Sequence, residues 1–416
     1  MKFDEYRISE GIKRSIDKLG YKKPTDIQYK SIPAILKGED VLAIAQTGTG
    51  KTAAFAIPIL HLLQEKKQKQ RRPDGIKCLI MAPTHELAQQ IDIVFKTLGK
   101  YTKVNTLCIH GGVDQEPQIQ KLNRGVDILV ATPGRVFDLV NQRVLRLNRV
   151  EMLVLDEADH MLDLGFIKDI RDLIRFLPKY RQTLFFSATI DDEIKKLAYS
   201  LVKNAIRIQI SPKDPVAKNI VHSVAKVEMD DKRFFLENVI RRQEGQKILV
   251  FVRTKVRAER VKKAMERVNL ETDTIHSDKL PEERKHTMRN FRKGELKVLI
   301  ATDISARGID IPNVEYVVNY DLPDNSDTYV HRVGRTGRGR EKGQAVSFCS
   351  SEEKEILKEI EENLGNPITR IELSRNEYLD IKDTTEEKPS DWKTLLKQAE
   401  QDESDWQKMK KKRRKK

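Results

Sequence analysis

A series of short apolar runs that alternates with helical patterns constrains the fold of this chain more than any other feature. In the first half the runs are DVLAIA, KCLIMAPT, DILVAT, MLVLDEAD and QTLFFSAT, and in the second half they are QKILVFVRTK, TDTIHS, KVLIATD and VEYVVNYD. Apolar strands separated by amphipathic helices are typical of a parallel sheet with helices on both faces. The run ILVAT, which ends at Thr132, is echoed by VLIAT, which ends at Thr302. The sequence therefore predicts an α/β architecture that is built twice.

The two halves are joined by the polar segment ISPKDPVAKNIVHS, whose prolines favour neither a helix nor a central strand. At the C-terminus, KMKKKRRKK places eight basic residues in the final nine, and such a block cannot form a buried core. We therefore expect a disordered basic tail. The boundaries that we expect are residues 1–210 for the first domain, 211–218 for a linker, 219–365 for the second domain and 366–416 for a C-terminal extension.

The composition indicates a globular protein with a polyanionic partner. The formal net charge is +15 over 416 residues, which favours nucleic acid, although a membrane surface or solubility alone would also fit. No apolar run reaches the roughly 18 to 20 residues that cross a membrane, and the N-terminus lacks the layout of a secretory signal, so we expect a cytoplasmic protein. The three cysteines are far apart and predict free thiols rather than a disulfide or a CxxC metal site.

The segment AIAQTGTGKTAAF follows an apolar run and leads into a helical pattern, which is the context that a phosphate-binding loop requires. Gly48 and Gly50 allow the backbone N–H groups to turn toward a phosphate. Lys51 supplies a positive charge, and Thr52 offers a hydroxyl to Mg²⁺. Ala45 stands where the general pattern has its first glycine. The sequence predicts a nucleotide site at this loop.

Three carboxylates, those of Asp156, Glu157 and Asp159, directly follow the apolar run MLVL. Such crowding fits a solvated turn, a metal site or one half of a catalytic site, and the phosphate loop favours the last. Mg²⁺ keeps several waters and takes few protein ligands. We therefore expect Asp156 and Thr52 to hold Mg²⁺ largely through water, and Glu157 to orient or deprotonate the attacking water.

Four motifs then occur in a recognisable order. DEAD at 156–159, AQTGTGKT at 45–52, SAT at 187–189 and HRVGRTGR at 331–338 resemble the motifs of DEAD-box RNA helicases of superfamily 2, and the short flanks are similar to those of the bacterial RhlE group. The resemblance implies two tandem RecA-like domains that bind ATP in the cleft between them. It also implies RNA-stimulated ATP hydrolysis that drives local, non-processive unwinding or the remodelling of ribonucleoproteins.

The resemblance assigns residues to the ATP site. GYKKPTDIQ is similar to the motif with which the family recognises adenine. The last two arginines of HRVGRTGR match arginine fingers that stabilise charge on the transferred phosphoryl group. The residues assigned to catalysis are Lys51, Asp156, Glu157, Arg335 and Arg338. Those assigned to the nucleotide are Phe3, Tyr21, Thr25, Gln28, Gln46, Thr47, Gly48, Thr49, Gly50, Lys51, Thr52, Gly308, Asp310, Arg335 and Arg338.

The resemblance also implies RNA contacts to sugar and phosphate, and therefore sequence-independent binding. The residues assigned to RNA are Pro83, Thr84, Gly112, Thr132, Pro133, Gly134, Arg135, Arg284, Thr302 and Arg307, although Arg284 fits a helix-face charge equally well. Those assigned to coupling of the two domains are Asp159, Ser187, Thr189 and His331, with Asp159 and His331 meeting across the cleft. His85 occupies a position that is usually arginine in the family, which could weaken an anion contact or make it pH-sensitive.

Two other functions stay open at the level of the sequence. An ATP-gated RNA clamp would hold a ribonucleoprotein, with unwinding incidental, and a DNA translocase would accept strands that lack the 2′-hydroxyl. The resemblance favours RNA. We expect a monomer away from membranes, with partners in ribonucleoproteins, ribosome assembly or RNA decay, and a basic tail that tethers structured RNA.

Overall fold

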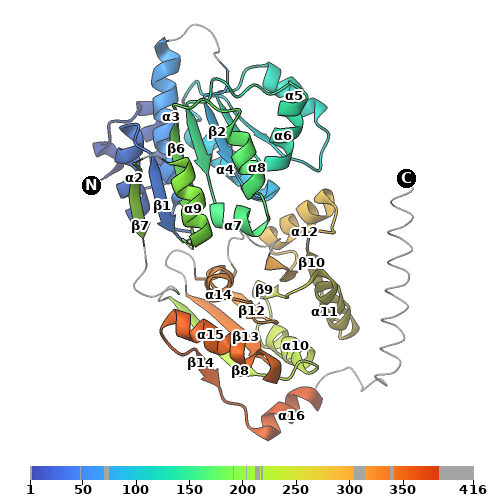
Figure 1. Ribbon diagram of the computed structural model, residues 1–416. Helices are drawn as coiled ribbons and strands as arrows, with labels where there is room; N and C mark the ends of the chain where they lie inside the picture. Colours follow the sequence, from blue (N-terminus) through green and yellow to red (C-terminus); the bar gives the residue numbers. More distant parts are fainter. Residues whose placement is uncertain are drawn as a thin grey trace.

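The computed structural model describes residues 2–46, 48–69, 75–190, 192–202, 204–210, 216, 219–303, 314–337 and 342–383. These residues form two seven-stranded sheets, in the orders β3-β4-β2-β5-β6-β1-β7 and β10-β11-β9-β12-β13-β8-β14. All strand pairs in both sheets are parallel. In Figure 1 the first sheet and its helices, coloured blue to green, lie above the second, coloured yellow to red. The expected α/β architecture, built twice, is therefore confirmed.

The first domain contains the elements of the N-terminal half. They are η1 (Phe3–Glu5), α1 (Glu10–Lys18), α2 (Asp26–Leu36), β1 (Val41–Ala45), α3 (Lys51–Lys69), β2 (Cys78–Met81), α4 (His85–Leu98), β3 (Thr106–Ile109), α5 (Glu116–Asn123), β4 (Ile128–Ala131), α6 (Pro133–Asn141), β5 (Met152–Leu155), α7 (Ala158–Asp163), α8 (Ile167–Ile174), β6 (Gln182–Ser187), α9 (Asp192–Leu201) and β7 (Ile206–Ile210).

The second domain repeats this alternation. Its elements are β8 (Ile220–Lys226), α10 (Lys232–Arg242), β9 (Ile248–Phe251), α11 (Lys255–Arg267), β10 (Thr272–Ile275), α12 (Pro281–Lys293), β11 (Val298–Ala301), β12 (Tyr316–Asn319), α14 (Ser326–Val333), β13 (Gly343–Cys349), η2 (Ser351–Glu353), α15 (Lys354–Leu364), β14 (Thr369–Ile371) and α16 (Arg375–Asp383).

Central strands such as β2 and β9 are apolar throughout because both faces of each sheet are covered there. In β2, Ile80 belongs to the apolar cluster on one face of the first sheet, whereas Leu79 and Met81 belong to the cluster on the other face. In β9, Leu249 and Val250 divide in the same way between the two clusters of the second sheet. Successive side chains of a strand point to opposite faces, so a strand buried on both sides has no polar side.

The second sheet continues beyond residue 365, where we expected this domain to end. β14 pairs with β8 in parallel register, and α16 packs on α10. Tyr378 of α16 donates a hydrogen bond from its hydroxyl to Asp231 (2.8 Å), and Lys382 makes an ion pair with the same carboxylate (2.9 Å). The sequence gave no sign of β14, because its three residues are all exposed and show no apolar pattern.

Parallel strands bring their carboxyl ends to one edge of a sheet. In the first sheet the segments after β1, β2, β4, β5 and β6 are those in which the sequence motifs lie, so the edge gathers them although they are far apart in the chain. Most of the expected linker and the basic tail lie outside the described residues. Within the described residues, no helix is long and apolar enough to cross a membrane. The three cysteines are free, as expected.

Candidate active site

The loop after β1 has the geometry of an anion site. Gly48 and Gly50 adopt φ values of 81° and 93°, in the left-handed region that favours glycine, and α3 begins directly afterwards at Lys51. The N-terminus of a helix attracts anions. The Lys51 side chain is 6% exposed, and its ammonium has no hydrogen-bond partner in the part of the chain that the structure describes. A buried cation without a partner is unfavourable unless a ligand supplies the anion.

Gln28 connects the segment that we expected to recognise adenine with this loop. Its side-chain oxygen accepts a hydrogen bond from the backbone N–H of Thr25 (3.0 Å), and its amide nitrogen donates one to the Gly50 carbonyl (3.2 Å). A Cβ on Gly50 would lie 2.5 Å from that nitrogen, so the close approach requires glycine. Phe3 is buried, and the centre of its ring lies 6.4 Å from that of Tyr21, which is exposed.

Other residues assigned to the nucleotide lie around the same loop. Thr49 donates a hydrogen bond from its hydroxyl to the Gln46 carbonyl (2.8 Å), which closes the turn of the loop. Thr52 is the second residue of α3 and is partly exposed. Thr52 therefore lies in the first turn of the helix that follows the loop. Thr47, Gly308, Asp310 and Arg338 lie outside the described residues.

Asp156 is the first residue after β5 and is 2% exposed. One of its carboxylate oxygens accepts a hydrogen bond from the backbone N–H of Glu157 (3.1 Å). Burial raises the pKa of Asp156 to about 7, against the attraction of the Lys51 charge and with a further rise from the neighbouring Glu157. A carboxyl group that resists ionisation in this way is one that a cation would stabilise strongly.

Glu157 has the opposite electrostatic setting. Burial alone would raise its pKa, but His160 and the charges of Lys51 and Arg335 outweigh burial and lower the pKa to about 2. The His160 ring nitrogen Nδ1 lies 3.5 Å from the Glu157 carboxylate. The Glu157 backbone is left-handed, with φ of 52°, a conformation that costs a non-glycine residue about 1–2 kcal/mol. The site thus holds an ionised carboxylate in a strained position next to a protonatable one.

His160 was missing from the sequence prediction. The side chain is buried, lies one helical turn after Glu157 and contacts its carboxylate. The spacing of three residues was a usable signal, because residues three apart on a helix are neighbours. The left-handed turn at Glu157 that aims the carboxylate was not visible in the sequence.

Asp159 joins the acid cluster to the SAT segment within the first domain. One of its carboxylate oxygens accepts hydrogen bonds from the backbone N–H groups of Ala188 (3.1 Å) and Thr189 (3.2 Å) and from the Thr189 hydroxyl (3.4 Å). The other carboxylate oxygen accepts a hydrogen bond from the His160 N–H (3.1 Å). These contacts lie within the first domain, and the expected meeting of Asp159 with His331 across the cleft stays a prediction.

Ser187 is fully buried at the end of β6, and its hydroxyl has no hydrogen-bond partner among the residues that the structure describes. We expected it to couple the domains together with Thr189 and His331. His331 is partly exposed on α14, which lies on the side of the second domain that faces the first domain in Figure 1.

The second domain reaches the acid cluster through α14 and the residues after it. Arg335 is buried, donates a hydrogen bond to the His331 carbonyl (3.2 Å) and lies close enough to Glu157 to lower its pKa. Arg332, which the sequence did not single out, fixes this helix. Its guanidinium makes two hydrogen bonds to the Asp303 carboxylate (2.6 and 2.7 Å) and one to the Asp321 carbonyl (2.6 Å).

The residues expected to contact RNA in the first domain follow β2 and β4 at the same edge of the sheet. Thr84 caps α4 by accepting a hydrogen bond from the Leu87 N–H (3.3 Å), and Thr132 and Pro133 begin α6. The Arg135 guanidinium is buried and donates to the Val113 carbonyl (2.7 Å), while two of its nitrogens have no partner within the described part of the chain. The remaining residues of this set are Pro83, which is buried, and Gly112 and Gly134, which are exposed.

In the second domain, Thr302 is buried after β11, whereas Arg307 lies outside the described residues. Arg284 makes an ion pair with Glu86 of the first domain (2.5 Å). We expected Arg284 to be an RNA contact or a helix-face charge, and neither expectation included this ion pair between the domains. The sequence could not reveal it, because Glu86 lies on α4 of the first domain and Arg284 on α12 of the second.

His85 and His110 form a stacked pair beside this ion pair. Their ring centres are 4.9 Å apart with an interplanar angle of 28°. Burial lowers the pKa of His85, the charges of His110, Arg284 and Arg135 lower it further, and Glu86 opposes them. His85 is therefore neutral near pH 7, and any contact that it makes with a phosphate lacks a full positive charge.

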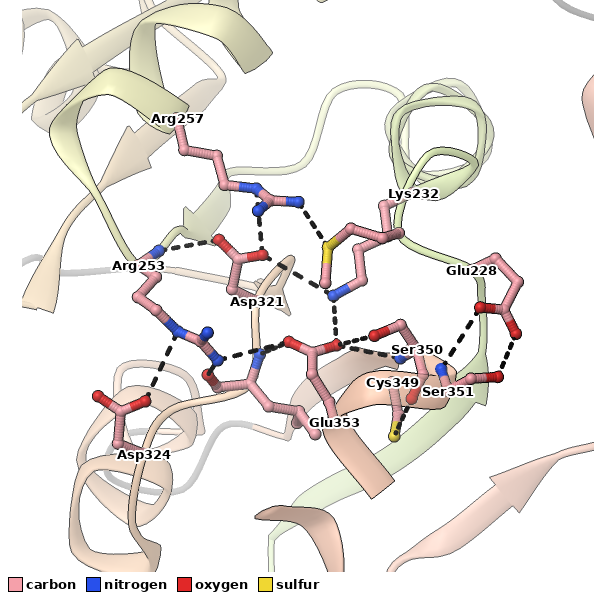
Figure 2. Close-up of polar contacts among 12 residues, drawn as sticks. Glu228, Lys232, Arg253, Arg257, Asp321, Asp324, Cys349, Ser350, Ser351 and Glu353 are labelled. Carbon is pink, nitrogen blue, oxygen red and sulfur yellow. Dashed lines mark hydrogen bonds and ion pairs between the residues drawn. The ribbon is translucent and has the colours of Figure 1, made fainter. Parts of the chain in front are cut away.

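The second domain has its own cluster of buried charge at the carboxyl ends of β9, β12 and β13 (Figure 2). The Lys232 ammonium is fully buried and lies 2.6 Å from the Glu353 carboxylate and 3.8 Å from that of Asp321. Arg257 makes an ion pair with Asp321 (3.2 Å), and Arg253 makes a longer one with Glu353 (3.7 Å). Burial would raise the pKa of Glu353, but the Lys232 charge outweighs it and the pKa is lowered. Every charge in this cluster has a partner of opposite sign.

Comparison with known proteins gives consistent results for both halves of the chain. Residues 25–197 match the family model of the DEAD/DEAH box helicases, and residues 231–340 match that of the helicase conserved C-terminal domain. The chain is 39% identical to the ATP-dependent RNA helicase CshA of Listeria monocytogenes over 361 residues, which cover 87% of this chain and 68% of that protein. It is 37% identical to the ATP-dependent RNA helicase DbpA of Bacillus subtilis, with 90% of this chain and 77% of that protein covered.

Two solved structures are similar to this one over most of the chain. S. cerevisiae Dbp5 bound to RNA and ADP BeF3 matches with a TM-score of 0.80 at 32% identity, covering 92% of this chain and 99% of that one. A DEAD box protein from Methanococcus jannaschii matches with a TM-score of 0.52 at 35% identity, covering 89% and 99%. The overall structure is therefore more similar to that of Dbp5 bound to RNA and nucleotide.

Proposed function

The chain belongs to the DEAD-box ATP-dependent RNA helicases, and from this premise we propose how its residues divide the work. As a member of this family, the protein hydrolyses ATP to unwind RNA. The two helicase domains that we propose comprise residues 1–210 and 219–383, with ATP bound between them. The observation that carries the proposal is the buried Lys51 ammonium, which has no hydrogen-bond partner within the described residues and whose charge acts on the acid pair Asp156 and Glu157.

The phosphates of ATP occupy the loop after β1. In this proposal Lys51 and the N–H groups around Gly48 and Gly50 bind the phosphate oxygens, and the bound phosphates remove the unfavourable burial of the Lys51 charge. Gln28 transmits the occupancy of the base site to the loop through its hydrogen bond to Gly50. ATP binding and the shape of the loop are thus linked.

Asp156 and Thr52 fit a hydrated Mg²⁺ ion, because a carboxyl that is held neutral by burial gains a counterion and the ion needs few direct protein ligands. The ion would neutralise charge on the phosphates. Within the described residues no three histidine, cysteine or acidic side chains are grouped as a metal site, which fits an ion that takes few protein ligands. Asp156 would hold the hydrated ion through a carboxylate that the hydrogen bond from the Glu157 N–H keeps in place.

Glu157 accepts the proton of the attacking water. The low pKa leaves the carboxylate ionised, and the left-handed backbone fixes its direction. Arg335 and Arg338 stabilise the charge on the transferred phosphoryl group once the second domain is docked. Catalysis therefore depends on the approach of α14, whose position Arg332 and Asp303 fix.

RNA binds along the carboxyl edges of both sheets. RNA and ATP both bind the closed form, so each raises the affinity of the protein for the other. The contacts reach sugar and phosphate, so binding is independent of sequence. We place the protein in the cytoplasm as a monomer that acts on structured RNA in ribonucleoproteins, ribosome assembly or RNA decay.

ATPase assays with and without RNA, on the wild type and on Glu157→Gln, test this function. RNA should stimulate the wild type, and the variant should lose about 10²–10⁴-fold in kcat while still binding nucleotide, because it lacks the base. Absence of stimulation in the wild type would overturn the coupling of RNA to hydrolysis. Normal hydrolysis by the variant would overturn the role of Glu157.

A further inference from the structure

Three basic side chains gather around one tyrosine beyond the end of α4, and a fourth basic residue follows in the chain. The guanidinium carbon of Arg14 lies 4.5 Å from the centre of the Tyr101 ring, and the ammonium nitrogens of Lys18 and Lys100 lie 5.3 and 5.9 Å from it. Lys103 follows two residues later, and all four basic side chains are exposed. We call these four residues and Tyr101 the basic cluster.

No acid neutralises the basic cluster within the described residues. None of its four cations makes an ion pair there, and neither does Asp17, which lies between Arg14 and Lys18 in α1. The Lys18 ammonium beside the phenol, with the charges of Lys100 and Arg14, lowers the pKa of Tyr101. Like charges held this close repel one another, so the cluster would gain from an anion.

The basic cluster is held in place by its surroundings. Gly11 of α1 packs so closely that a Cβ there would lie 2.3 Å from the Tyr101 carbonyl oxygen. The Lys103 N–H donates a hydrogen bond to the Gln64 side chain on α3 (2.7 Å), and the Thr102 hydroxyl donates one to the Gly99 carbonyl (2.8 Å). A ligand would therefore meet a turn whose backbone is already ordered, which lowers the entropic cost of binding.

The position of the basic cluster separates it from the candidate active site. α4 begins at His85, at the carboxyl edge of the first sheet, and its 14 residues run for about 21 Å before the chain turns at Gly99 toward Tyr101. The cluster therefore lies at the opposite edge of the domain. An RNA strand in the interdomain site has to extend past the domain surface to reach it.

We propose that the basic cluster is a second RNA-binding site, which holds the sugar–phosphate backbone of the strand or duplex that lies outside the interdomain site. The cations neutralise phosphates, and the Tyr101 hydroxyl donates a hydrogen bond to a phosphate oxygen while the Lys18 ammonium faces its oxygen. The proposal rests on RNA binding at the interdomain site. RNA is favoured over an acidic protein because a strand held there is present at a high effective concentration near the cluster.

The test compares a short RNA strand, which spans only the interdomain site, with a long strand that has a duplex flank. In the variant Arg14→Ala, Lys18→Ala, Lys100→Ala, affinity for the long strand should fall about tenfold, and the slope of log affinity against log salt should decrease by about 2, roughly 0.7 per cation removed. Affinity for the short strand and the ATPase rate at saturating short RNA should stay unchanged.

Two matched variants control for charge and folding. Removing three lysines elsewhere in the first domain, by Lys30→Ala, Lys37→Ala and Lys179→Ala, should leave the preference for the long strand intact. Exchanging the cations, by Arg14→Lys, Lys18→Arg and Lys100→Arg, keeps the charge of the basic cluster and should therefore keep the preference for the long strand.

Three results would overturn the second site. In the first, the triple alanine variant binds the long strand as tightly as the wild type does. In the second, it loses the same affinity for both strands. In the third, the basic cluster binds a polyglutamate peptide but not the long strand. If the wild type failed to bind even the short strand, the interdomain RNA site would be wrong instead.

Discussion

Two clusters of buried charge lie at the carboxyl ends of strands in the two domains, and they are built in opposite ways. In the second domain the Lys232 ammonium lies between two carboxylates, the nearer at 2.6 Å (Figure 2). In the first domain the Lys51 ammonium has no hydrogen-bond partner within the described residues, and the neighbouring Asp156 has a pKa raised to about 7 by burial. The same fold therefore supports a completed network in one domain and an incomplete one in the other.

The difference shows what separates a cluster that satisfies its own charges from one that could accept a ligand. A buried ion pair whose members also accept hydrogen bonds satisfies its own charges, so it resists any change of state. An incomplete cluster is unfavourable until ligands arrive, and this unfavourable energy is released when nucleotide and the second domain bind. Four predictions test this contrast.

Lys232→Met should have the largest effect, on stability. The substitution leaves Glu353 and Asp321 buried without their central cation, so the second domain should lose about 3–5 kcal/mol in urea unfolding. The ATPase rate of the protein that remains folded should change little. The double variant Lys232→Met, Glu353→Gln should recover part of the loss, and a single variant as stable as the wild type would contradict the contrast.

Lys51→Met should have the second largest effect, on catalysis. It removes a cation that binds the phosphates, so kcat should fall by about 10²–10³. The stability of the nucleotide-free first domain should change little, because the lost attraction to the Glu157 carboxylate is offset by the removal of a buried charge that has no hydrogen-bond partner within the described residues. A loss of stability as large as that of Lys232→Met would show that the first cluster is already complete.

The pH dependence of unfolding should reveal the raised pKa of Asp156. Its pKa is raised from the ordinary 3.8 to about 7 in the folded protein, so the folded state binds more protons than the unfolded chain between these values. The stabilisation is complete below pH 4 and is lost as the pH rises through 7. Thermal unfolding without nucleotide at pH 5 and pH 8 should show this loss in the wild type, and Asp156→Asn should reduce it. Equal pH dependence in both proteins would exclude Asp156 as the group.

The ion pair between Glu86 and Arg284 should have the smallest effect. The two side chains are 23% and 18% exposed, so solvent screens the pair and it should contribute about 0.5–1 kcal/mol to closure. A double-mutant cycle with Glu86→Gln and Arg284→Gln, read from the KM for RNA in the ATPase assay, should give a coupling of about two- to fivefold. Additive effects would mean that the pair does not help to join the domains.

The sequence predicted those parts of the site that depend on local pattern. The strands, the phosphate loop and the acids after β5 were all placed, because parallel strands bring their carboxyl ends together whatever the loops between them. His160 could have been found from its spacing to Glu157. The strained, left-handed backbone of Glu157, which directs its carboxylate, could not have been found from the sequence.

The parts that the sequence missed depend on contacts between distant segments. Lys232 and Glu353 are 121 residues apart, and neither lies in a motif. Arg332 lies within a motif but acts through Asp303 and Asp321, which only the packing of α14 brings to it. The N–H groups of Ala188 and Thr189 donate to the Asp159 carboxylate from segments about 30 residues away, and the expected role of Asp159 in coupling did not include them. Spacing along the chain does not decide between such competing partners.

Proton release on nucleotide binding tests most directly whether the first cluster is completed by its ligand. Calorimetry at pH 7, in two buffers of different ionisation enthalpy, measures the protons released when the protein binds a Mg²⁺–nucleotide complex. The wild type should release about half a proton more than Asp156→Asn, because about half of the Asp156 carboxyls are protonated at a pKa of about 7 and all must ionise on binding. Equal release by the two proteins would contradict an acid cluster that stays incomplete until its ligand binds.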